Sequence, residues 1–188
     1  LLDYANEAGK KIWPISSGKN WGYGSSLPVT DDNIILDLNK LNEISDFDKV
    51  NGIVTLGPGV TQGQLFDFLE GSDFIVPITG AGPSVSVLGN LLERGYGLAP
   101  IQDHFSALIS MKAFLASGEE YNTSLTEIVG DKLGKKFKWG IGPYLNGIFT
   151  QSNFGVVTEV TIQLGRKAKH MELVKLSFDD SSLPNVVG

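Results

Sequence analysis

The chain has 188 residues, of which 41% are hydrophobic and 19% charged, as in a folded globular protein. Its formal net charge is −6 and no basic stripe occurs, so a nucleic-acid partner is not expected. No apolar run approaches the roughly 20 residues of a membrane helix, and the absence of cysteine excludes disulfides and cysteine metal sites. We expect a soluble protein, and prefer the cytoplasm among the compartments that the sequence leaves open.

The first half of the chain contains short apolar runs typical of strands and periodic stretches typical of helices. Strands are predicted over residues 11–15, 33–38, 52–56 and 73–79, and helices over 1–9, 61–71 and 84–92. The second of these helices has a distinct start, because Thr61 and Gln64 have the spacing of a capping box.

The second half contains fewer predicted elements. Strands are predicted over residues 108–116 and 156–164, a hairpin turn over 118–121, and a short helix over 142–149 that Pro143 begins. Strands and helices do not alternate evenly, so an α+β domain with mixed sheets fits better than a doubly wound sheet. The first residues resemble the middle of a helix and the tail stops after a strand-like stretch, which favours a fragment of a longer chain over a short mature protein.

Glycine is the residue type in clear excess, with 23 copies. The densest stretch is residues 16–25, where successive backbone N–H groups can form a concave anion site. The serine hydroxyls and the Asn20 amide add donors, which suits a pyrophosphate. The stretch is neither a Walker motif nor a G-x-G-x-x-G pattern. Taken alone, such a loop is more often a solvent-exposed turn.

Four stretches, in this order, resemble flavoproteins grouped with vanillyl-alcohol oxidase and p-cresol methylhydroxylase: residues 14–24, 57–61, 87–97 and 151–158. The resemblance implies a PCMH-type FAD-binding domain, built from two small α/β subdomains and occupying residues 1–188. It also implies that the family's first strand and helix and its C-terminal substrate cap domain are missing, so that the domain is truncated at both ends.

The resemblance further implies that FAD is the cofactor and which residues bind it. The pyrophosphate is expected against residues 17–22, the isoalloxazine and ribityl chain against residues 82–97, and the adenine edge at Val157. A side chain at any glycine of the second loop would hold the flat ring away from the backbone, and Asn90 could bind a ring or ribityl oxygen, or merely cap or be solvated. The expected cofactor-binding residues are Ser16, Ser17, Gly18, Lys19, Asn20, Trp21, Gly22, Pro58, Gly82, Ser86, Gly89, Asn90, Glu93, Gly95, Gly97 and Val157.

Tyr23 is the expected catalytic residue. In relatives that act on para-substituted phenols, the tyrosine of this loop helps to hold the substrate as its phenolate, which favours hydride transfer to flavin N5. The alternative is a tyrosine that only packs on the flavin edge. Two departures weaken the phenol interpretation, since residues 79–84 lack the acidic residue of the family's phenol oxidase and Leu98 replaces its tyrosine. No histidine near Lys19 offers a covalent flavin link, although the missing C-terminal part could supply one.

The expected function is oxidation of a para-substituted phenol or benzylic alcohol by an FAD-dependent oxidoreductase. Alternatives are the same domain with another cap acting on a hydroxy acid or sugar alcohol, and a flavin-binding module without catalysis. Expected partners are a small-molecule substrate, with a homodimer and an electron-acceptor protein as candidates. Asp103 and His104 are not expected to form a catalytic pair, because neighbours in an extended segment face opposite ways. His170 is expected at the surface, and no metal site is expected.

Overall fold

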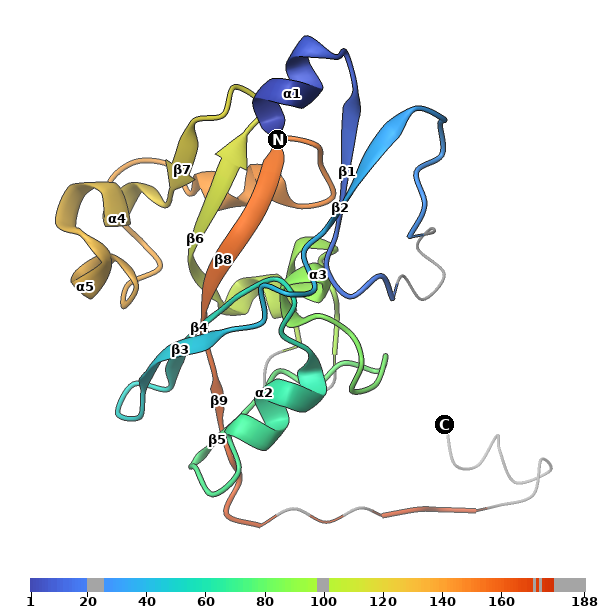
Figure 1. Ribbon diagram of the computed structural model, residues 1–188. Helices are drawn as coiled ribbons and strands as arrows, with labels where there is room; N and C mark the ends of the chain where they lie inside the picture. Colours follow the sequence, from blue (N-terminus) through green and yellow to red (C-terminus); the bar gives the residue numbers. More distant parts are fainter. Residues whose placement is uncertain (20–25, 98–101, 171, 173, 178–188) are drawn as a thin grey trace, which may run out of the picture.

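The computed structural model describes residues 1–19, 26–97, 102–170, 172 and 174–177. Its strands form three sheets (Figure 1). The largest is antiparallel, with the order β3 (Ile44–Asp48), β4 (Ile53–Leu56), β8 (Gly155–Gln163), β6 (Leu108–Leu115) and β7 (Glu120–Asn122). The two smaller sheets are the parallel pair β1 (Lys11–Ile15) with β2 (Asn33–Asp37) and the antiparallel pair β5 (Phe74–Ile75) with β9 (Gly165–Arg166).

The helices are short. They are α1 (Leu2–Glu7), α2 (Gln62–Phe68), α3 (Val87–Leu92), α4 (Ser124–Val129) and α5 (Asp131–Gly134), with 3₁₀ segments over His104–Ala107 and Leu145–Phe149. Figure 1 shows α4 and α5 at one edge of the molecule, with β1 and β2 on the opposite side of β8. None of the helices in the described residues combines the length and apolar character needed to cross a membrane.

One face of the large sheet forms the core. Successive side chains of a strand point to opposite faces, so Val54 and Leu56 of β4 share a face with Val160 and Ile162 of β8. Helices α2 and α3 contribute buried leucines to the same cluster, among them Leu65. Full burial of a side chain of this size stabilises the fold by about 1.5–3 kcal/mol.

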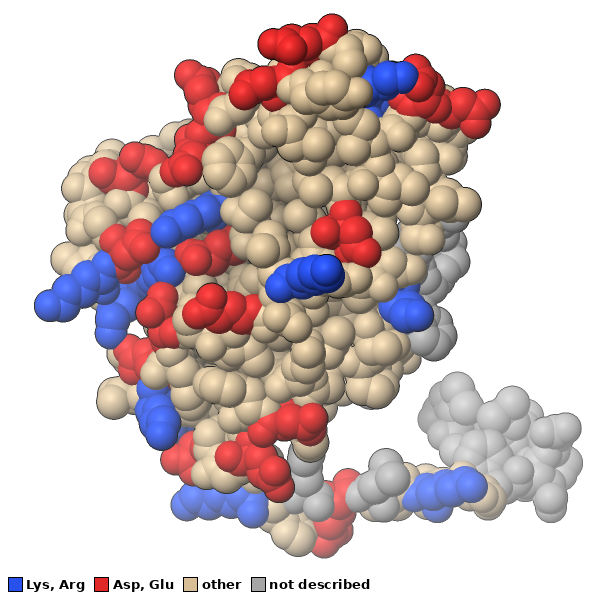
Figure 2. Space-filling view, in the orientation of Figure 1, with Lys and Arg blue, Asp and Glu red and all other residues tan. Residues whose placement is uncertain are grey.

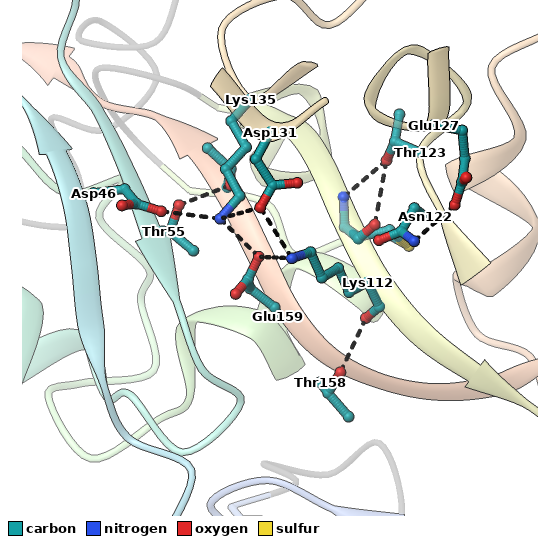
Figure 3. Close-up of polar contacts among 12 residues, drawn as sticks. Asp46, Thr55, Lys112, Asn122, Thr123, Glu127, Asp131, Lys135, Thr158 and Glu159 are labelled. Atoms are coloured by element: carbon teal, nitrogen blue, oxygen red, sulfur yellow. Dashed lines mark hydrogen bonds and ion pairs between the residues drawn. The ribbon is translucent and has the colours of Figure 1, made fainter. Parts of the chain in front are cut away.

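The opposite face of the sheet is polar and is covered by α5. Lys135 Nζ lies 2.9 Å from both Asp46 of β3 and Glu159 of β8, and its side chain is only 12% exposed. Figure 3 shows that these groups converge from the two strands and the helix, with Lys112 of β6 bonded to Asp131 beside them. The ion pairs therefore fasten α5 across three strands, over an open pocket of about 310 Å³.

Charges on the surface are mixed. Figure 2 shows acidic and basic side chains interspersed along one side of the visible face, next to a broad area with few charges. No basic stripe is visible among the described residues on this face.

Most predicted elements are confirmed, and the predicted capping box of α2 is present, with Thr61 N donating to Gln64 Oε1 at 2.9 Å. That helix ends at Phe68 rather than Gly71. The predicted helix over 142–149 is a 3₁₀ segment that begins at Leu145 rather than at Pro143. The sequence did not predict β3, β9, α4 or α5. In β3 the register shifts and Asp46 has a φ of +50°, which breaks the alternation that identifies a strand.

Candidate functional site

Three of the four motifs meet at Ser86, which is 1% exposed and caps the N-terminus of α3. Its backbone N–H donates to Ser17 Oγ of the first glycine loop at 3.1 Å. Its hydroxyl donates to the carbonyl oxygen of Pro58 at 2.7 Å and accepts from the backbone N–H of Gly89 at 3.0 Å. Segments 28 and 69 residues away are thereby joined to the second glycine loop by one serine.

The first glycine loop begins directly after β1. Ser16, Ser17 and Gly18 are half-buried, Lys19 is exposed, and Gly18 has a φ of +67°, which glycine adopts without strain. The loop lies close to α3, since a Cβ on Gly89 would be 2.7 Å from Ser16 Oγ. The other expected residues of this loop, Asn20, Trp21, Gly22 and Tyr23, lie outside the described residues.

Three glycines of the second loop lie very close to other atoms of the chain. A Cβ on Gly95 would lie 2.1 Å from Asn90 Nδ2, and one on Gly97 would lie 2.3 Å from His104 Nε2. These contacts are a second reason for glycine at Gly89, Gly95 and Gly97, and the expectation that side chains there would meet the flavin ring stays a prediction. In each case the added atom would first meet this chain's own atoms.

His104 lies beneath the second loop and is 1% exposed. Its Nδ1 contacts Asn90 Oδ1, and its backbone N–H donates to the carbonyl of Gly95 at 3.0 Å. Burial lowers the pKa of His104, against the opposing influence of the Asp103 charge and of the Ile78 carbonyl, so the imidazole is neutral near pH 7.

The segment containing His104 is a 3₁₀ turn with Asp103 at its start, so the expectation of an extended segment is wrong. No sequence pattern indicates the contact between His104 and Asn90, because they are 14 residues apart and lie in different elements. His170 is exposed, as predicted, and its Nε2 lies 2.6 Å from Glu172.

The remaining described residues that were expected to bind the cofactor are Gly82, Glu93 and Val157. Gly82 is exposed with a φ of +87° and open space beside it, and Glu93 is exposed at the C-terminal end of α3. Val157 is buried in β8, paired with Ala113 of β6. Pairing of β8 with β4 stops at Val160, so within the described residues Val157 has a strand neighbour on one side only.

The described groups fit a dinucleotide cofactor. The Ser86 and Gly89 donors are used within the junction, which leaves the hydroxyls of Ser16 and Ser17 beside Lys19 as neutral donors of the kind that bind pyrophosphate. Asn90 is half-buried, and its Nδ2 makes no hydrogen bond within the described residues. Among those residues no group of three histidine or acidic side chains is placed to hold a metal ion.

Known proteins resemble this chain in sequence and fold. Residues 1–124 match the FAD binding domain family. The 1'-carboxy-chondrochloren decarboxylase of Chondromyces crocatus is 40% identical over 94% of this chain and 33% of its own length. The 4-cresol dehydrogenase [hydroxylating] flavoprotein subunit of Pseudomonas putida is 36% identical over 97% of this chain and 35% of its own length.

A third relative is the mitochondrial D-2-hydroxyglutarate dehydrogenase of Danio rerio, 31% identical over 94% of this chain and 32% of its own length. Among solved structures, p-cresol methylhydroxylase with substrate bound matches with a TM-score of 0.85 and 35% identity. That match covers 90% of this chain and 33% of the solved one. The chain thus spans about a third of the length of these relatives.

Proposed function

This chain belongs to the FAD binding domain family, and from that premise we propose that it is the flavin-holding part of an oxidoreductase of para-substituted phenols or benzylic alcohols. The family membership confirms FAD as the cofactor and the PCMH-type mixed α/β fold predicted from the sequence. The further proposal is that residues 1–188 are one part of a longer protein, preceded by a strand and helix and followed by a substrate cap domain.

The observation on which the proposal depends is the junction at Ser86. It brings Ser17 and Pro58, from two separate motifs, against the first turn of α3. Four ordered motifs could match by composition alone, but these hydrogen bonds give the motifs a common place in the fold. The similarity to p-cresol methylhydroxylase, at a TM-score of 0.85, supports a phenol as substrate.

Within this proposal the residues have separate tasks. Backbone amides of residues 17–22 hold the pyrophosphate, residues 82–97 lie along the ribityl chain and ring, and Val157 meets the adenine edge. FAD, when bound, supplies a hydride acceptor at N5. The task of Tyr23 is to donate a hydrogen bond to the phenolate oxygen of the substrate, which stabilises the charge that assists hydride departure.

The relatives also motivate a second candidate. Their names include a D-2-hydroxyglutarate dehydrogenase and a decarboxylase, so the same domain could serve a hydroxy acid. Assays of the complete protein on 4-hydroxybenzyl alcohols and on 2-hydroxy acids separate the two. Turnover of the acids without turnover of any phenol would contradict the phenol proposal, and failure of any substrate to reduce the bound flavin would favour a non-catalytic module.

The electron acceptor is proposed to be oxygen or a carrier protein. The Pseudomonas putida relative is named a flavoprotein subunit, which supports an association with a second protein. Reoxidation of the substrate-reduced protein in air, followed by its flavin absorbance, tests for oxygen. Slow reoxidation in air would favour the carrier protein.

The first experiment is the visible absorption spectrum of the purified complete protein, repeated on the supernatant after acid precipitation. Yellow colour released to the supernatant is expected, because the first loop lacks a histidine for covalent attachment. Colour retained in the pellet would place a covalent link elsewhere in the protein. A colourless protein that also fails to bind added FAD would contradict the proposed function.

A further inference from the structure

We propose that His104 is a positioning residue that turns the amide of Asn90 so that its oxygen, rather than its nitrogen, faces the flavin. The inference rests on the proposed FAD site, and it concerns two side chains whose relationship no sequence motif indicates. It assigns Asn90 the part of a hydrogen-bond acceptor. Its partner would then be a donor of the cofactor, either the ring N3–H or a ribityl hydroxyl.

The imidazole is enclosed by the second glycine loop and by residue 78. Nδ1 contacts Asn90 Oδ1, so the proposal exchanges the oxygen and nitrogen positions of that amide. Nε2 is buried without a hydrogen bond of good geometry in the described residues. The missing Cβ of Gly97 would lie 2.1 Å from the Ile78 carbonyl oxygen and 2.3 Å from Nε2, so these two atoms border the same small space.

The carbonyl oxygen of Ile78 determines which ring nitrogen of His104 carries the proton. A carbonyl oxygen only accepts hydrogen bonds, so a lone pair on Nε2 would be repelled, whereas an Nε2–H group is attracted. A neutral imidazole has a single ring proton, so protonation at Nε2 leaves a lone pair at Nδ1. His104 is a neutral imidazole because burial lowers its pKa.

The lone pair at Nδ1 then decides the orientation of Asn90. Amide oxygen and nitrogen have nearly the same shape, so the surrounding hydrogen bonds determine which of them faces a neighbour. An acceptor at Nδ1 requires the NH₂ group of Asn90, which directs the amide oxygen away from the ring. Backbone hydrogen bonds keep the two residues close together, since His104 N–H donates to Gly95 O and Gly95 N–H donates to Asn90 O at 2.8 Å.

The tautomer can be measured directly in the complete, FAD-loaded protein labelled with ¹⁵N-histidine. The His104 signals are assigned from their loss in His104→Gln, and His170→Gln, at an exposed position, is the matched control. Neutral His104 protonated at Nε2 is the expected result. Protonation at Nδ1, or a charged ring near neutral pH, would overturn the proposal.

Two variants of Asn90 test the acceptor independently. Asn90→Leu removes the amide and is expected to weaken FAD binding by roughly tenfold, as the loss of one hydrogen bond does. Asn90→Asp keeps an outward acceptor, and its second oxygen can bond to His104 after the ring gains a proton at Nδ1. It should therefore stay within about threefold of the parent protein and raise the pKa of His104 in the NMR titration.

An Asn90→Asp protein that binds FAD as weakly as Asn90→Leu would contradict the acceptor assignment, since a carboxylate has no donor to offer. Circular dichroism of both apo variants confirms that they fold. If the parent protein binds no FAD, the proposed function fails. The tautomer in the apo protein still tests the relationship between His104 and Ile78, so the two failures are distinguishable.

Discussion

The Cα of Gly97 faces the carbonyl oxygen of Ile78 so closely that a Cβ at Gly97 would lie 2.1 Å from it. The backbone here is fixed from two sides, because Gly97 forms a bridge with Thr79 and its N–H donates to the Gln102 carbonyl at 2.8 Å. Neither partner is the flexible end of a side chain. The contact closes the second glycine loop over His104.

Gly97→Ala is therefore expected to be destabilising. The added methyl must displace backbone, and overpacking of this kind lowers the free energy of unfolding by about 3 kcal/mol. Urea denaturation measures the loss. Gly147→Ala is the control, since a Cβ there meets nothing within 4 Å, and its stability should be unchanged. A Gly97→Ala protein as stable as the control would show that the loop backbone can move to accommodate the methyl group.

Ser86→Ala removes the hydroxyl from the junction of the motifs. The N-terminus of α3 loses its cap and the Pro58 carbonyl loses its donor, so the free energy of unfolding should fall by about 2 kcal/mol. FAD affinity should fall with it, because the first turn of α3 is no longer held against Pro58, although the backbone N–H of Ser86 still donates to Ser17 Oγ. Ser84→Ala, two residues away and exposed, should change neither quantity. Equal stability of the two variants would contradict the role of Ser86.

Asp46→Asn tests the ion pairs under α5. The hydrogen bond from Lys135 lowers the pKa of Asp46, against the opposing effect of burial. A lowered pKa in the folded state stabilises the fold above the ordinary value of 3.8 and loses that effect as the pH falls through the folded-state pKa. Asparagine also tolerates the φ of +50° at this position.

The variant should lose about 0.5 kcal/mol of stability near pH 7, since Asp46 is largely exposed, and nothing near pH 2. Denaturation curves at both pH values provide the measurement, with Asp67→Asn on the exposed side of α2 as the control. A loss that is the same at both pH values would mean that the carboxylate charge is not its cause.

Tyr23→Phe tests the proposed phenolate contact. Removing one donor to a developing oxyanion lowers kcat by roughly a hundredfold, while FAD should stay bound with an unchanged spectrum. Tyr4→Phe is the control, because that tyrosine is exposed on α1 and lies outside both glycine loops. Unchanged phenol turnover in Tyr23→Phe would mean that Tyr23 only packs against its neighbours and does not bind the phenolate.

Local patterns in the sequence were sufficient to predict most of the helices and strands. The capping box at Thr61 depends on residues three apart, and its prediction is confirmed by the helix that follows. In β3 the local signal fails, because the positive φ at Asp46 and the shifted register replace an even alternation. That strand is recognised only through its pairing with β4.

The site was predictable in its motifs but not in its contacts. The sequence identified Ser17, Ser86 and Gly97 as candidates, yet the bond between Ser17 and Ser86 spans 69 residues and depends on the tertiary fold. For the same reason the sequence did not show that a Cβ at Gly97 would meet the Ile78 carbonyl oxygen. It also treated His104 as part of an extended segment, since nothing nearby in the sequence shows what buries its ring.

The pairing of β1 with β2 has a consequence for the length of the chain between them. Parallel neighbours require a connection that returns along the whole strand, and a helix usually makes that journey. Here residues 16–32, which include the first glycine loop, form the connection, and their described part contains no helix. At about 3.3 Å per residue the return along five paired positions consumes a fixed part of this segment. Lengthening this segment leaves the pairing of the two strands intact, whereas shortening it below the roughly five residues that the return needs would separate them.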